Sequence, residues 1–198
     1  MDFTAHMEKI LKEARAKNLI EVREQIHTAD IQNKIANHIE RWDGSFSAEE
    51  IEARIMTDDL IASLFAVNPL RQNICEKEAI DVLGNLVKRM ASQGKNCVRF
   101  TVDGDIVSKK GTDTSESADC LYLGEYYATL KYTKEEGGAQ NNQYEKVNTF
   151  LRYGSINHKV AAIVDGPYWD KHRASLEEEY GSNPNVIITS VTEITENI

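Results

Sequence analysis

Cysteine, basic charge and long apolar runs are scarce in this chain of 198 residues, and each shortage excludes a class of protein. The 3 cysteines are odd in number and lack C-x-x-C spacing, so neither a disulfide framework nor a zinc site is expected. The 23 Lys and Arg residues against 32 Asp and Glu give a net charge of -9, which excludes a generally basic protein that coats nucleic acid or a membrane surface. No apolar run approaches the roughly 18 residues of a membrane-spanning helix, and charges interrupt residues 1–20, unlike a signal peptide. We therefore expect a cytoplasmic protein without membrane association.

Several common catalytic motifs are missing too. The sequence has no Walker loop, no G-x-G-x-x-G and no G-x-S-x-G, so nothing supports a nucleotide hydrolase, a dehydrogenase or an α/β-hydrolase. Its 5 histidines show no H-x-x-x-H or H-x-H ligand spacing. Hydrophobic residues make up 41% of the chain, however, which is enough to build a core for one domain or somewhat more.

The first ninety residues carry apolar side chains at helical spacing. A capping box, S-x-x-E, runs from Ser47 to Glu50 and predicts the start of a helix. Helical stripes also cover residues 3–14 and 31–42, a short apolar run covers 60–67, and a longer helix is predicted over 72–90. After Gly94 the apolar residues alternate, which is typical of strands. The pattern predicts strands over 97–102, 118–123 and 127–133 as a β-meander, a helix over 140–153, a strand over 159–164 that is covered on both sides, a helix over 171–180 and a strand over 185–190.

The most informative residues are Asp119, which opens one strand, and Lys131, which lies on the next strand of the same hairpin. They share a face only if the loop has an odd number of residues, for instance 124–126, or contains a bulge. A two-residue loop would place Leu130 opposite Asp119 instead. Carboxylates beside an amine suit metal-dependent phosphodiester hydrolysis, because hard oxygens bind Mg²⁺ while a lysine orients water and stabilises developing charge. An ordinary surface ion pair is the alternative interpretation.

This order of elements around Asp119 and Lys131 resembles the core of the PD-(D/E)XK nuclease superfamily, over roughly residues 68–190. The resemblance implies an α/β fold in which residues 68–198 form a restriction-endonuclease-like catalytic core, a mixed central sheet flanked by helices. Residues 1–67 would form a helical N-terminal region for dimerisation or DNA contact. It further implies a Mg²⁺-dependent type II restriction endonuclease that cuts double-stranded DNA at a specific sequence, with Asp119 as metal ligand and Lys131 orienting the nucleophile.

One position departs from the family pattern, because Thr129 stands where the second acid is expected. Some restriction enzymes of the superfamily have Ser or Thr there and supply a glutamate from the following helix, after thirteen intervening residues. That spacing from Lys131 leads to Glu145. Glu145 is therefore a candidate metal ligand, although its helical position points away from the apolar face, so an exposed surface acid is the alternative. Thr129 marks either a displaced glutamate or lost activity.

Glu76 is a further candidate for catalysis and metal binding. It lies at the head of the stripe formed with Ile80, Leu83 and Val87, and a carboxylate on a packing face needs a partner or a metal. Relatives often place an acid on this first core helix. The alternative is an acid that interacts favourably with the dipole of the first helical turn.

Other residues are candidates for DNA contact. Gln140 and Tyr144 resemble the Q-x-x-x-Y element of RecB-like nucleases, another branch of the superfamily. The DNA-binding candidates are Gln140, Asn141, Lys134, Arg152 and Arg173, and further bases that could line a cleft are Lys95, Arg99, Lys109 and Lys110. Asp165, in Asp-Gly-Pro, is interpreted as a turn residue and not as a catalytic acid.

The resemblance also implies partners. Cutting both strands of a palindrome favours a homodimer with two-fold symmetry, and a cognate DNA methyltransferase would act on the same site. Two alternatives stay open: a catalytically inactive PD-(D/E)XK-like module that binds DNA or protein, and a RecB-like exonuclease.

Overall fold

The computed structural model describes the chain except for residues 42–43, 70–72, 135–137 and 198, and the side chains of residues 138–141 also lie outside the description. The chain forms two compact units: residues 8–74, and residues 1–7 together with 75–198. The sequence predicts the boundary between the helical region and the α/β core between residues 67 and 68. Residues 1–7 thus belong with the second unit, and helix α1 (Phe3–Glu24) contributes to both.

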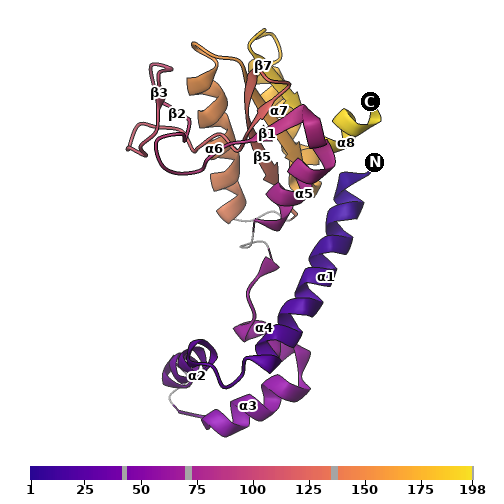
Figure 1. The fold of residues 1–198 in the computed structure, drawn as a ribbon, viewed down its shortest axis with the longest axis vertical. Coiled ribbons are helices and arrows are strands. Elements are labelled where there is room, and N and C mark those ends of the chain that lie inside the picture. Colours follow the sequence, from indigo (N-terminus) through magenta and orange to yellow (C-terminus); the bar gives the residue numbers. More distant parts are fainter. Residues whose placement is uncertain (42–43, 70–72, 135–137, 198) are drawn as a thin grey trace. The chain divides into compact units, whose positions relative to one another are not determined.

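The unit of residues 8–74 is helical (Figure 1). It contains the greater part of α1 and α2 (Ala29–Arg41), α3 (Ala48–Thr57) and α4 (Asp59–Phe65). Its core comprises Val22, Ile26, Ile31, Ile35, Ile51, Ile55, Ala62 and Phe65. The capping box is confirmed, because the Glu50 N–H donates to Ser47 Oγ at 3.2 Å and the Ser47 N–H donates to Glu50 Oε2 at 2.8 Å. Of the predicted stripe at 31–42, Trp42 lies outside the described residues.

The second unit is α/β. Along the chain it contains α5 (Ile74–Leu83), η2 (Gly84–Leu86), β1 (Val87–Arg89), β2 (Arg99–Phe100), β3 (Ile106–Val107), β4 (Cys120–Tyr122), β5 (Tyr126–Tyr132), α6 (Gly138–Gly154), β6 (Val160–Asp165), α7 (Pro167–Tyr180), β7 (Val186–Thr189) and α8 (Val191–Glu196). Among the described residues, the main sheet has five strands in the order β1-β4-β5-β6-β7. The β1-β4 and β4-β5 pairs are antiparallel, and the β5-β6 and β6-β7 pairs are parallel. The chain is therefore an α/β protein with a helical N-terminal region and a mixed sheet with interspersed helices.

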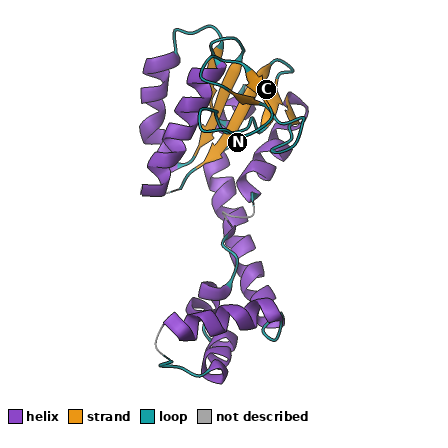
Figure 2. Cartoon of the chain, turned by 90° about the vertical axis from the view of Figure 1, so that its left-hand side faces the viewer, coloured by secondary structure: helices purple, strands orange, loops and turns teal. Residues whose placement is uncertain are grey.

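Strand β6 lies between β5 and β7, and all six of its residues are buried. This confirms the prediction of a strand covered on both sides, because its apolar run has no polar alternation. Helices lie on both sides of the strands in Figure 2. The core there comprises Phe100, Ala118, Val147, Phe150, Leu151, Val160, Ala162, Val164, Tyr168, Trp169, Leu176 and Tyr180.

The helix predicted over residues 72–90 is wrong in its second half. Helix α5 ends at Leu83, Gly84 takes a positive φ of 52°, and residues 87–89 form strand β1. Val87 fits a helical stripe, but its backbone pairs with Tyr122 of β4. Pairing with a strand more than thirty residues away overrides the local periodicity.

The meander prediction is wrong in its first strand. Residues 99–100 form β2, which pairs only with β3 in a separate two-stranded sheet of the described chain. The chain reverses at Gly104, whose φ is 83°, so this segment closes a small hairpin. Strand β1 takes the expected place beside β4 in the main sheet.

The two ends of the chain meet in the second unit (Figure 1). The Phe3 N–H donates to Thr192 Oγ1 at 3.0 Å, and the Met1 ammonium donates to Thr195 Oγ1 at 3.1 Å. Both threonines lie on α8, a helix that was not predicted. Within the described ranges, no helix combines the length and apolar character that crossing a bilayer requires.

Candidate functional site

The hairpin of β4 and β5 brings Asp119 and Lys131 together. Its loop has three residues, 123–125, because Tyr122 pairs with Tyr126. Leu123 and Gly124 take positive φ values of 52° and 75°, which reverse the chain. The loop is thus odd in length, as the shared face requires, although it lies one residue earlier than 124–126. Lys131 Nζ donates to Asp119 Oδ2 at 3.0 Å, and both side chains are largely buried.

Asp119 receives three hydrogen bonds on one oxygen. Besides Lys131 Nζ, the Leu130 N–H donates to Oδ2 at 2.8 Å and Thr129 Oγ1 donates to it at 3.2 Å. Oδ1 accepts no hydrogen bond from the part of the chain that the structure describes. Three donors hold the carboxylate in one orientation and leave one oxygen available to a ligand.

Thr129 is buried within this site. Its hydroxyl acts as a donor to Asp119. A hydroxyl carries no charge, so this position adds no second carboxylate to the site.

Glu76 lies on α5 and pairs with Arg89 of β1, with Arg89 Nη2 at 3.2 Å from Oε1. Arg89 in turn lies opposite Cys120, the residue that follows Asp119. Burial chiefly raises the pKa of the Cys120 thiol to about 12, the charges of Asp119 and Glu76 raise it further, and Lys131 opposes them. Both acids and the lysine therefore act electrostatically at the start of β4.

Glu145 is exposed on α6, and no hydrogen bond or ion pair joins it to Asp119 or Lys131 in the described structure. Among the described residues, no group of three or more His, Cys, Asp or Glu side chains is placed to hold a metal ion. The predicted ligand set of Asp119, Glu145 and Glu76 is thus not assembled as a three-carboxylate site. The helical position of Glu145 explains this, because it turns the side chain away from the packed face.

The remaining predicted DNA contacts are dispersed. The side chains of Gln140 and Asn141 lie outside the described residues, Lys134 follows β5, and Arg152 is exposed near the end of α6. Arg173 is engaged in the protein itself, with Nε 2.7 Å from Glu177 Oε1 and Nη1 2.6 Å from Glu193 Oε1. These partners support a structural role for Arg173.

Asp165, expected in a turn, is a buried residue at the end of β6. Its Oδ2 accepts a hydrogen bond from the Val191 N–H at 2.9 Å, which ties β6 to the start of α8. Burial raises the pKa of Asp165 to about 6, against hydrogen bonds from the backbone of Val191 and Thr192.

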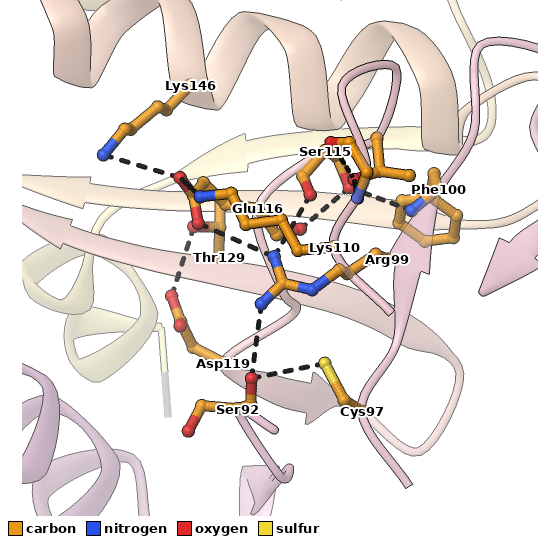
Figure 3. A network of polar contacts seen from close by, with 12 residues as sticks. Ser92, Cys97, Arg99, Phe100, Lys110, Ser115, Glu116, Asp119, Thr129 and Lys146 are labelled. Atoms are coloured by element: carbon orange, nitrogen blue, oxygen red, sulfur yellow. Dashed lines mark hydrogen bonds and ion pairs between the residues drawn. The ribbon is translucent and has the colours of Figure 1, made fainter. Parts of the chain in front are cut away.

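Glu116, three residues before Asp119, is surrounded by a cationic cluster. Two of its bases, Arg99 and Lys110, were among those expected to line a cleft, whereas Lys146 and Glu116 itself were not predicted. The nitrogens within 4 Å of its carboxylate are Lys110 Nζ at 3.1 Å, Lys146 Nζ at 3.5 Å and Arg99 Nη1 at 3.6 Å. Figure 3 shows Lys146 extending from α6 and Arg99 from β2 toward this acid. Partial burial acts to raise the pKa of Glu116, but the hydrogen bond from Lys110 and the charges of Lys146, Lys110 and Arg99 lower it below the ordinary value. No local pattern could reveal the cluster, because its members come from separate segments.

Fold and site together define an α/β protein with a partly buried lysine–carboxylate pair on a mixed sheet. No protein family matches the chain, and no curated protein or solved structure is significantly similar to it. The residues present fit one Mg²⁺ ion, because this ion commonly uses one or two protein carboxylates and completes its shell with water and substrate phosphate. Asp119 Oδ1 would be the first ligand.

Proposed function

We propose that the chain is a Mg²⁺-dependent endonuclease acting on double-stranded DNA, of the type II restriction kind. The observation that carries the proposal is the environment of Asp119: three donors on Oδ2, including Lys131 Nζ at 3.0 Å, and a second oxygen that accepts no bond from the described chain. A bare carboxylate repels phosphate, whereas a carboxylate that holds a divalent ion attracts it. When bound, the ion would supply Lewis-acid activation of the phosphodiester and of the attacking water.

The residues of the chain have separate roles in this proposal. Thr129, Leu130 and Lys131 all donate to Oδ2 of Asp119, so the residue binds its ligand through the other oxygen, Oδ1. Lys131 orients the attacking water and stabilises the charge that develops on the phosphate. Cleavage of both strands requires two such sites, so the active species is a homodimer, and a methyltransferase of the same specificity would protect the host DNA.

The first test is plasmid cleavage. Wild-type protein with Mg²⁺ should linearise or nick closed circular DNA, and chelation of the metal should abolish this. Lys131→Ala should reduce the cleavage rate about 10²–10³-fold, because it removes a charge that acts on the transition state. Lys159→Ala is the matched control, since Lys159 also forms an ion pair, 2.7 Å from Glu125, but lies at the other end of the hairpin. Equal activity of the two variants would contradict the assignment of Lys131.

The second test concerns specificity. Digestion of an unmethylated phage genome should give discrete bands, whereas a smear would contradict a site-specific enzyme. Degradation of linear DNA with closed circles spared would indicate the RecB-like exonuclease instead.

One alternative is favoured by a specific observation. Thr129 replaces an acid, and the described residues contain no three-carboxylate cluster. A module that only binds DNA or protein needs no further carboxylates at this site. It would leave DNA intact with every divalent ion, so the plasmid assay distinguishes the two.

A further inference from the structure

The cluster around Glu116 contains more positive than negative charge. Three cationic side chains, those of Arg99, Lys110 and Lys146, surround this single carboxylate. Several donors therefore surround one anion, and in this structure that anion is the carboxylate of Glu116. A phosphate group has the same charge sign and more acceptor oxygens than a carboxylate.

The three cations differ in how firmly they are held. The Arg99 side chain is only 9% exposed, and its guanidinium also donates to the carbonyl oxygens of Ser115 at 3.2 Å and Ser92 at 3.3 Å. Lys110 and Lys146 are 63% and 37% exposed, and Glu116 is the one partner that each has among the described residues. Arg99 is therefore a fixed part of the structure, whereas the two lysines can exchange Glu116 for an external anion at little cost, because exposed ion pairs are weak.

The cluster also lies close to the candidate active site. Glu116 and Asp119 are three residues apart on one segment without helix, so their Cα atoms are separated by at most about 11 Å. Phosphates follow one another along a DNA strand about every 3.4 Å of helix axis, so at most about three nucleotides separate the two positions. A strand whose phosphate lies at Asp119 would bring another phosphate to the cluster.

We propose that Lys110 and Lys146 bind a backbone phosphate of duplex DNA beside the candidate active site, and that Glu116 occupies this phosphate position in the free protein. DNA binding then exchanges an internal ion pair for an external one. The proposal takes its ligand from the proposed function, but it concerns binding and not cleavage.

The test measures the affinity for a short fluorescent duplex by anisotropy, without divalent ions and over a series of salt concentrations. The double variant Lys110→Gln/Lys146→Gln should bind more weakly, and the slope of log K against log salt should become less steep by about 0.9, the value for one lost phosphate contact. The control Lys77→Gln/Lys159→Gln removes the same charge, from an exposed lysine of α5 and from a lysine paired with Glu125. It should change the slope much less.

Glu116→Gln supplies the complementary test. It frees both lysines, so the affinity for DNA should rise several-fold. Glu125→Gln, which removes a carboxylate paired with Lys159, gives the same change in net charge and should leave the affinity nearly unchanged. Thermal unfolding of each variant identifies any effect that comes from loss of folding.

The outcomes separate this inference from the proposed function. Equal slopes for the two double variants, or equal affinities for Glu116→Gln and Glu125→Gln, would overturn the phosphate site even if the protein cleaves DNA. The expected slopes and affinities without metal-dependent cleavage would support the phosphate site and contradict the nuclease. A wild-type protein that binds no duplex would overturn the phosphate site.

Discussion

The two oxygens of Asp119 have different surroundings, and this difference decides which of them can bind a ligand. Oδ2 is saturated by Thr129, Leu130 and Lys131, while Oδ1 accepts nothing from the described chain. An aspartate on an exposed surface would rotate and share its oxygens among solvent molecules. Here the orientation is set before a ligand arrives, so a ligand at Oδ1 does not have to order the side chain.

The sequence could predict the meeting of Asp119 and Lys131, because the parity of a hairpin loop decides which side chains share a face. It could not predict the cluster at Glu116. Lys146 lies thirty residues further along the chain on α6, and its 3.5 Å approach depends on how that helix packs on the sheet. The same limit applies to Glu145, whose relation to the site depends on the rotation of α6.

Asp165 should make stability depend on pH. Burial raises its folded-state pKa to about 6, above that of the unfolded chain, so the folded state binds a proton more readily. The contribution of Asp165 to stability is complete below about pH 4 and is lost as pH rises toward 6. Relative to Asp165→Asn, the wild type should therefore lose at most about 3 kcal/mol over this window.

Urea unfolding at several pH values measures this effect, with Trp42→Phe as background so that Trp169 reports alone. The charge of Arg173 lowers the pKa of Asp165 and the charge of Glu193 raises it. Both residues stay unchanged in the two proteins that are compared. Asp170→Asn, at an exposed acid of α7, is the control for loss of one charge. A constant difference between wild type and Asp165→Asn from pH 4 to 7 would contradict the buried, reluctantly ionised carboxyl.

At the level of elements, sequence signals predicted the structure correctly where the hydrogen bonds they imply form between residues close in sequence. The box at Ser47 and Glu50 starts α3 because both of its hydrogen bonds are formed within four residues. A second box, Ser190 to Glu193, starts α8 in the same way and could have predicted that helix. Strand β1 had no such signal, since its residues become a strand only through pairing with β4.

Gly166 fixes the passage from β6 to α7. Its φ is 101°, and an added Cβ would lie 2.5 Å from the carbonyl oxygen of Thr133. Gly166→Ala should therefore destabilise the α/β unit by about 3 kcal/mol or more, from backbone strain together with the clash. Gly124→Ala is the matched control, because φ is also positive there, at 75°, but no atom lies within 4 Å of the added Cβ.

Chemical denaturation of both glycine variants gives the comparison. Gly124→Ala should cost about 1–2 kcal/mol, from the left-handed conformation alone. Equal losses for the two variants would show that the approach of Thr133 contributes nothing.

At the scale of the whole molecule, residues 1–7 complete a unit that otherwise begins at residue 75. Phe3 is 1% exposed, and its ring meets that of Tyr132 edge-on at 6.4 Å. Phe3→Ala should lower the free energy of unfolding of the α/β unit by about 3–5 kcal/mol, as large-to-small changes in a core do.

Fluorescence of Trp169 in the Trp42→Phe background measures this loss. Ile20→Ala is the control on the same helix, since Ile20 is 55% exposed, and it should change the stability by less than about 0.5 kcal/mol. If Phe3→Ala is equally neutral, the first residues do not belong to the α/β unit.

The contact between Phe3 and Thr192 sets an order of events during synthesis. These residues are 189 positions apart, so the ribosome adds the threonine long after the phenylalanine has emerged. The helical unit, residues 8–74, can fold while translation continues, whereas the start of α1 must wait until α8 has been made. The α/β unit therefore closes only after Thr192 has left the ribosome.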